Sequence, residues 1–145
     1  MAINQATILL IPDEFINSTS FEIDNLFDTD GYNDSSLAWK NYPNSSDLNV
    51  TIDKYFKRGK QWHEDIVSWG DEQESDIQLI FEDNSVTDFV IRLSVNKEFD
   101  EWIEKVNVLS KEISCSLFLP TSKLIFKPDS EMLKAAITKI LQNRK

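Results

Sequence analysis

Carboxylates are the side chains in this sequence that are most able to do chemistry, and they gather before one strand. In the stretch SWGDEQESDIQLIFED, residues 68–83, a Trp-Gly pair is followed by four acids within six residues. These acids are Asp71, Glu72, Glu74 and Asp76. Such a cluster can bind a metal ion, act as general acid and base, or contact a basic partner.

The pattern of possible metal ligands argues against a metal centre. The stretch DTDGYND, residues 28–34, is rich in oxygen ligands. If Gly31 were the sixth residue of an EF-hand loop, the first and twelfth positions would be Leu26 and Leu37, which cannot coordinate calcium. An irregular calcium site remains open at this stage. One histidine and one cysteine, far apart in sequence, do not make a zinc site, so we expect no metal and no cofactor.

Known catalytic motifs are also absent from the sequence. It lacks the G-x-S-x-G nucleophile elbow, and its only histidine is His63. Its three glycines are too few and too dispersed for the glycine-rich loops that bind nucleotides. A pair of hydrolytic acids needs a concave apolar site, whereas these acids fall in expected loops. We therefore predict no catalytic residue, with a carboxylate-dependent hydrolase as an alternative.

The net charge of −10 is distributed unevenly along the chain. Residues 1–100 contain 20 acids and 7 bases, whereas residues 101–145 contain 5 acids and 8 bases. Phosphate binding requires a clustered basic face, so the sequence predicts no nucleic-acid ligand. An acidic surface instead favours a cationic protein partner, whose encounter it accelerates. The same acidity is also typical of a soluble protein with no such partner.

A partner-binding surface is predicted where these acids surround tryptophan. Residues 62–76 contain no Lys or Arg, and acids around tryptophan anchors suit a hot spot for a basic partner. The predicted partner-binding residues are Glu64, Asp65, Trp69, Asp71, Glu72, Glu74 and Asp76. The acids of residues 22–34 are a possible extension of this surface. The competing interpretation places the tryptophans in the core and leaves the acids in a solvated loop.

Features of the chain that report on location predict a cytoplasmic protein. No apolar run approaches the roughly 20 residues of a membrane helix, so no membrane partner is expected. The N-terminal stretch MAINQATILLIP lacks the basic start of a signal peptide. The single cysteine, Cys115, has no partner for an internal disulfide, and its apolar context predicts a buried thiol.

Hydrophobic periodicity predicts the elements that position these residues. Strands are expected at residues 5–11, 66–69, 77–82, 88–95, 115–119 and 124–126, and long amphipathic helices at residues 99–113 and 132–141. The strands at residues 77–82 and 88–95 are expected to form an antiparallel hairpin, with Phe81 among its core residues. Asn96 is expected to cap the first long helix.

Two segments are less regular. Residues 48–58 predict a helix capped by Ser46, although Leu48, Val50 and Ile52 also alternate as in a strand. Residues 13–47 predict an irregular excursion pinned by aromatic side chains, namely Phe15, Phe21, Phe27, Tyr32, Trp39 and Tyr42. The element order predicts a single α+β domain over residues 1–145, with a mostly antiparallel sheet and both long helices packed on one face.

The sequence contains the turn Trp69-Gly70-Asp71-Glu72, the hairpin strands DIQLIFED and VTDFVIRLSV, and a helix after them. Together these features resemble a group of small uncharacterised bacterial proteins. Members share a Trp-Gly-acidic turn and an arginine, here Arg92, on the second strand of the hairpin. The resemblance covers about residues 62–140 and implies no activity. By size and acidity, the chain is also similar to bacterial immunity proteins, which neutralise toxins delivered by neighbouring cells.

The leading hypothesis is therefore a cytoplasmic immunity-type protein that neutralises a basic toxin domain through its acidic surface. The alternative is an adaptor or structural module, or a homodimer, that uses the outer strand face carrying Arg92, Val90 and Ile80. The oligomeric state stays open.

Overall fold

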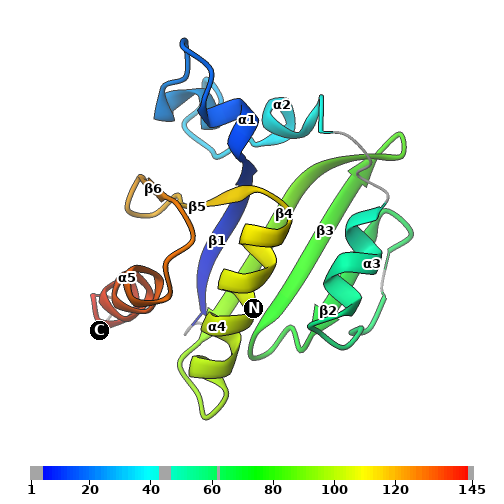
Figure 1. The fold of residues 1–145 in the computed structure, drawn as a ribbon, viewed down its shortest axis with the longest axis vertical. Helices are drawn as coiled ribbons and strands as arrows, with labels where there is room; N and C mark the ends of the chain where they lie inside the picture. The colour runs from blue at the N-terminus through cyan, green and yellow to red at the C-terminus, as the bar shows by residue number, and fades with distance from the viewer. Residues whose placement is uncertain (1–4, 43–46, 62, 144–145) are drawn as a thin grey trace.

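A computed structural model describes residues 5–42, 47–61 and 63–143 of the chain. Its strands form one antiparallel sheet of six strands in the order β2-β3-β4-β1-β5-β6 (Figure 1). The strands are β1 (Gln5–Pro12), β2 (Ile66–Gly70), β3 (Asp76–Glu82), β4 (Ser85–Ser94), β5 (Cys115–Leu119) and β6 (Leu124–Phe126). The helices are α1 (Asp13–Ile16), the 3₁₀ helix η1 (Ile23–Leu26), α2 (Ser36–Trp39), α3 (Leu48–Asp53), α4 (Phe99–Glu112) and α5 (Ser130–Gln142). The predicted α+β class is confirmed.

The β3–β4 hairpin is the best-predicted part of the sheet. Its turn residues Asp83 and Asn84 both have positive φ, 51° and 66°, as a tight two-residue hairpin turn requires. Leu79 lies opposite Phe89 across the hairpin, and both side chains are fully buried. Phe81 packs against the main core as predicted, but it lies just beyond a register shift after Ile80 and is only partly buried.

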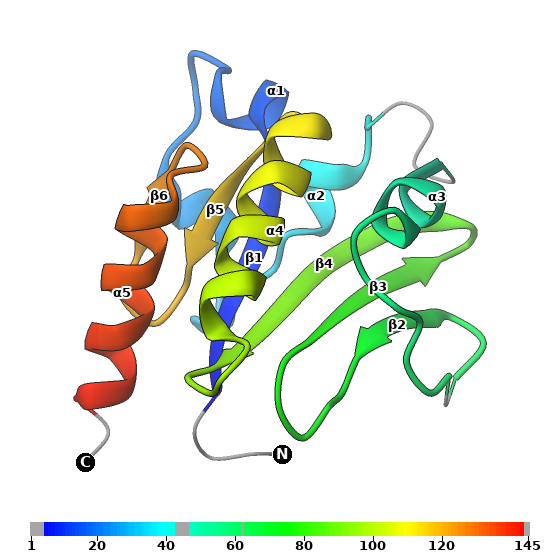
Figure 2. The same cartoon turned by 60° about the horizontal axis from the view of Figure 1, so that its bottom comes forward.

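The main core lies between one face of the sheet and the helices α3, α4 and α5. Figure 2 shows α4 running over the sheet with α5 beside it. Side chains of all three helices join the same cluster as the strand residues of that face, which confirms that both long helices pack on one side. We call this side the helix face and the opposite side the outer face. No helix in the described part of the chain combines the length and apolar character that a membrane span requires.

The helix predicted over residues 48–58 exists but is shorter than expected. The structure ends α3 at Asp53, although Phe56 beyond it still packs into the main core. The predicted cap Ser46 lies outside the described residues. The chain beyond α3 then runs along the free edge of β2. There the Gly59 amide donates to the Ser68 carbonyl and the Gly70 amide donates to the Lys57 carbonyl, each at 2.9 Å.

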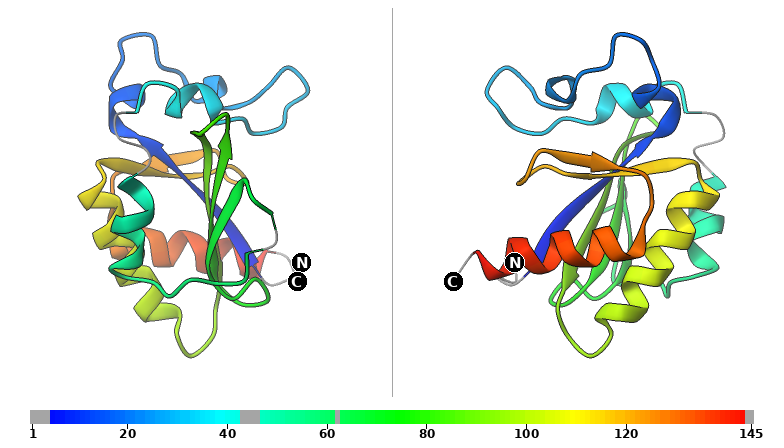
Figure 3. Two further views of the ribbon diagram at one scale, coloured as in Figure 1. Left: turned by 90° about the vertical axis from the view of Figure 1, so that its right-hand side faces the viewer. Right: turned by 60° about the vertical axis from the view of Figure 1, so that its left-hand side comes forward.

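Residues 13–39 lie at the Pro12 end of β1 (Figure 3). Their apolar side chains build a second, smaller core on the outer face of the sheet. Phe27 packs edge-to-face on Phe118 with ring centroids 5.7 Å apart, and Phe15 meets Phe21 in the same way at 5.6 Å. Trp39 turns to the main core, where its indole nitrogen donates to the Leu10 carbonyl at 3.1 Å. Aromatic side chains therefore anchor this segment to the sheet.

Two other aromatic residues of this excursion behave differently from each other. Tyr42 pins the chain through its hydroxyl, which donates to the Ile113 carbonyl at 2.8 Å. Tyr32 is 73% exposed, so the prediction that it anchors the segment is wrong.

Candidate functional site at the β2–β3 loop

Trp69, the last large side chain before the acids, is a core residue. It is fully buried, and its indole nitrogen donates to Asp53 Oδ1 at 2.8 Å. The Arg58 guanidinium lies 5.0 Å from the Trp69 ring centroid and also donates from Nε to Asp53 Oδ1 at 2.8 Å. The hydrogen bond from Arg58 lowers the pKa of Asp53, and the one from Trp69 lowers it to a lesser degree. Because Trp69 is enclosed in this way, its predicted contact with a partner is wrong.

Gly70 reverses the chain between Trp69 and the acids. Its φ is +85°, a conformation that side-chain-bearing residues rarely adopt. A Cβ atom there would lie 2.4 Å from the Ser75 carbonyl oxygen and 2.9 Å from the Trp102 ring. The Trp-Gly pair is therefore a structural unit, in which tryptophan anchors the end of β2 and glycine opens the loop.

Replacing Gly70 with Ala should lower the free energy of unfolding by at least about 2 kcal/mol, because backbone strain and a steric clash add together. A matched control is Gly31→Ala, where φ is +87° but a Cβ atom would meet nothing within 4 Å. That control should cost only about 1 kcal/mol, from backbone strain alone. Urea denaturation of both variants measures the difference, and equal losses would show that the packing around Gly70 does not matter.

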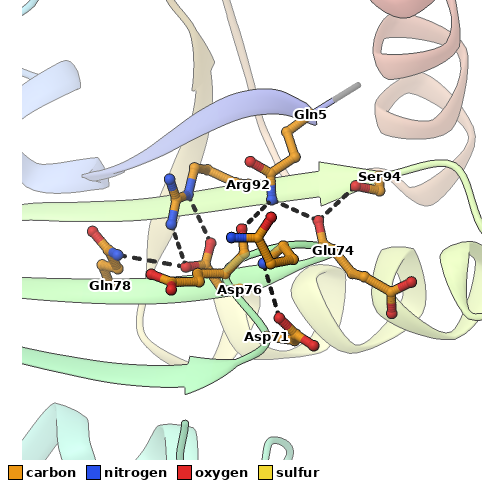
Figure 4. A network of polar contacts seen from close by, with 9 residues as sticks. Gln5, Asp71, Glu74, Asp76, Gln78, Arg92 and Ser94 are labelled. Atoms are coloured by element: carbon orange, nitrogen blue, oxygen red, sulfur yellow. Dashed lines mark hydrogen bonds and ion pairs between the residues drawn. The ribbon is translucent and has the colours of Figure 1, made fainter. Parts of the chain in front are cut away.

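The backbone of the β2–β3 loop is held by side chains of two other strands (Figure 4). From β1, Gln5 Nε2 donates to the carbonyl oxygens of Glu72 at 3.0 Å and Glu74 at 2.7 Å. From β4, Ser94 Oγ donates to the Glu74 carbonyl at 2.6 Å, and the Ser94 amide donates to Ser75 Oγ at 3.0 Å. The loop is thus fixed at its middle and at its end.

Asp76 forms the floor of the site together with Arg92. The two residues face each other across β3 and β4, and Arg92 donates from Nε to Asp76 Oδ1 at 2.8 Å and from a terminal nitrogen to Oδ2. The side chain of Asp76 is 2% exposed and that of Arg92 is 17% exposed. Hydrogen bonding to Asp76 raises the pKa of Arg92.

This burial corrects one prediction. Asp76 was expected to contact a partner, but burial and its pairing with Arg92 withdraw it from the surface. Arg92 does lie on the outer face as expected, although its charge is neutralised there. Its neighbours Val90 and Ile80 are only partly exposed, and Val90 packs against the second core.

Three of the predicted acids stand together on the surface. Asp71, Glu72 and Glu74 are all exposed. Asp71 Oδ1 accepts from the Gln73 amide at 2.9 Å, which shapes the turn. Among the described residues, the carboxylates of Glu72 and Glu74 form no ion pair. We refer to these three side chains as the acidic triad.

The other predicted acids lie elsewhere. Glu64 and Asp65 are exposed, but they precede β2 whereas the triad follows it. The Asp65 carbonyl accepts from the Phe81 amide at 2.8 Å, which places it near the far end of β3. Five residues of strand separate the two groups by about 15 Å. The acids of residues 22–34 follow the Pro12 end of β1, about 25 Å from the Gln5 end that touches the loop. The structure thus divides these acids into separate groups, and their contact with a single partner stays a prediction.

The structure adds one acid that sequence reasoning missed. Glu98 lies before α4, and it lines a depression of about 300 Å³ together with Asp71 and Glu74. Asn96 Oδ1 accepts from the Glu98 amide at 2.9 Å, but the N-cap of α4 is Glu98, two residues later, so the prediction that Asn96 caps this helix is wrong. The signal in the sequence was the turn that joins β4 to α4, which the sheet brings beside the β2–β3 loop.

The two other candidates for chemistry have local structural roles. Asp28 Oδ1 accepts from the amides of Asp30 and Tyr32, and Asp34 Oδ1 accepts from the Ser36 amide. Exposed His63 accepts at Nδ1 from the Asp65 amide at 3.0 Å. Within the described ranges, no group of three or more His, Cys, Asp or Glu residues is placed to hold a metal ion.

The acidic triad is the group of predicted site residues that the structure brings together at the surface. The resemblance to immunity proteins stays a prediction. Comparisons with protein-family models, with curated proteins and with solved structures gave no match.

Proposed function

We propose that this chain is an immunity-type binding protein that neutralises a basic toxin domain, which docks on the acidic triad of Asp71, Glu72 and Glu74. The observation that carries the proposal is the contrast within the loop. Its backbone is held by Gln5 and Ser94, whereas its carboxylates point outward without ion pairs among the described residues.

A fixed loop favours binding because little conformational entropy is lost when the partner arrives. Ordering a mobile side chain or loop opposes association, and a site that is already ordered avoids part of that cost. The buried Asp76–Arg92 pair lies directly beneath the loop and fixes the register of β3 against β4. The triad is thus presented on a rigid base.

The local charge supports a cationic partner. Glu98 adds a fourth carboxylate beside the triad. Basic residues also lie nearby, but Arg58 is engaged by Asp53 at 2.8 Å, which leaves Lys57, Lys60 and Lys97 as the unpaired cations among the described residues of this region. Four carboxylates against three ammonium groups leave a net negative charge, whose field accelerates encounter with a positive surface and weakens with salt.

Affinity capture with variant baits tests this proposal. Wild-type protein at low salt should retain a basic protein from a lysate of the source cells, and the triple variant Asp71→Asn/Glu72→Gln/Glu74→Gln should lose it. The matched control is Glu64→Gln/Asp65→Asn/Glu82→Gln, which removes the same charge from exposed acids at the other end of the hairpin. Mass spectrometry identifies what each bait retains.

The triad variant should keep the melting temperature of the wild type, because exposed charges crowded in a loop contribute little to stability. Loss of capture with an unchanged melting temperature assigns the triad to recognition. Equal capture by both triple variants, or the absence of any basic protein on the wild-type bait, would contradict the proposal.

A further inference from the structure

A small polar pocket lies on the outer face of β2 and β3, directly beside the acidic triad. It has a volume of about 290 Å³. Its lining residues include Lys60, Ser68, Asp71, Glu72, Asp76 and Gln78. That volume lies at the lower limit of the range of about 300–1,000 Å³ that is usual for pockets that bind drug-sized molecules, and it has room for one long side chain.

Ser68 is the unusual member of the lining. Its neighbours Val67 and Trp69 pack into the main core, so strand alternation directs Ser68 to the outer face, opposite Gln78 on β3. Ser68 is 7% exposed, and its Oγ has no hydrogen-bond partner among the described residues. A buried hydroxyl without a partner is costly, which points to a ligand that supplies one.

The charges around the pocket select the sign of that ligand. Arg92 already neutralises Asp76, and Gln78 Nε2 donates to Asp76 Oδ2 at 3.5 Å. The carboxylates of Asp71 and Glu72 then outnumber the single ammonium of Lys60. Lys60 is exposed and has no ion pair in the described part of the chain, so it is free to swing away from the pocket.

We infer that this pocket receives one arginine side chain of the basic partner, an inference that rests on the proposed function and names its anchor. A guanidinium group carries five donors in a plane and is suited to several acceptors at once. The acceptors offered here are the carboxylates of Asp71 and Glu72 and the hydroxyl of Ser68. Lys60 repels the same ligand through its positive charge, so removing that charge should strengthen binding.

Peptide titrations followed by NMR test the anchor without the natural partner. The probes are acetyl-Gly-Gly-Arg-Gly-Gly-amide and the same peptide with citrulline, which keeps the shape of arginine and removes its charge. In ¹⁵N-labelled full-length protein, the arginine peptide should give saturable shifts at Ser68, Gly70 and Gln78. The citrulline peptide should bind at least about fivefold more weakly, since charge-assisted hydrogen bonds are roughly twice as strong as neutral ones.

Two variants test individual lining residues. Ser68→Ala should weaken the arginine peptide about threefold to fivefold, because it removes one acceptor, without lowering the melting temperature. Lys60→Met should strengthen the peptide about threefold through loss of repulsion. Lys139→Met is the matched control, since it removes one exposed charge from α5 far from the pocket, and it should leave the affinity unchanged.

Equal binding of the arginine and citrulline peptides, shifts confined to other residues, or identical effects of Lys60→Met and Lys139→Met would overturn the inference. The outcome is separable from that of the proposed function. If a captured basic protein binds the Ser68→Ala and Lys60→Met variants with the same affinity as the wild type, that result would contradict the anchor alone. Saturable arginine binding in this pocket, with no basic protein captured, would uphold the anchor and contradict the proposed function.

Discussion

Truncating Phe89 to Ala should lower the free energy of unfolding by about 3–5 kcal/mol, the range for a large aromatic side chain lost from a core. Phe89 lies on β4, pairs with Leu79 and stacks on Trp39 with ring centroids 6.0 Å apart. It is fully buried, so its removal leaves a cavity that the neighbouring strands cannot close without strain. Urea denaturation followed by tryptophan fluorescence measures the loss.

The matched control for this prediction is Phe81→Ala. Phe81 is the same residue type on the same hairpin, but it lies beyond the register shift and is only partly buried. Its truncation should cost about 1–2 kcal/mol, because less apolar surface leaves the core. Equal losses at the two positions would mean that the hairpin register described here is wrong.

Replacing Asp76 with Ala should lower the free energy of unfolding by about 3–5 kcal/mol, as for other buried ion pairs that lose one partner. The change leaves the Arg92 guanidinium largely buried beneath the loop without its counter-charge. The double variant Asp76→Leu/Arg92→Leu should recover most of the loss, because it removes both charges and keeps an apolar volume. Chemical denaturation of the single and double variants measures this coupling.

Asp71→Ala provides the control for Asp76→Ala. Asp71 is an acid of the same segment, but its side chain is exposed, so its loss should change stability by less than about 1 kcal/mol. If Asp76→Ala cost no more than Asp71→Ala, the buried pair would not stabilise the fold. Because the pair supports the loop, Asp76→Ala should also weaken binding of the proposed partner although the Asp76 carboxylate is already neutralised by Arg92.

Local patterns in the sequence were sufficient to predict most of the fold. Alternation of apolar and polar residues placed β3 and β4, and helical periodicity placed α4 and α5, because each element has one face that must be buried. The register shift next to Phe81 was not predictable, since it depends on the pairing of two strands. The shorter α3 has a similar cause, because the chain after Asp53 turns to pair with β2.

The candidate site was predictable only in part. The acidic character of residues 71–76 is evident from composition, but burial of Asp76 depends on Arg92, sixteen residues later and brought opposite by strand register. The restraints from Gln5 and Ser94 and the proximity of Glu98 arise from sheet order in the same way. Residue type therefore indicated which chemistry was available, and only the tertiary structure separated the exposed acids from the buried one.

The most direct test of the central claim is the association rate of the captured partner as a function of ionic strength. The rate should be measured for the wild type, the triad variant and the matched triple variant at the other end of the hairpin. We expect the rate for the wild type and the matched control to fall steeply and in parallel between about 10 and 150 mM salt, with a much flatter dependence for the triad variant. Three parallel curves would contradict recognition of a basic partner through Asp71, Glu72 and Glu74.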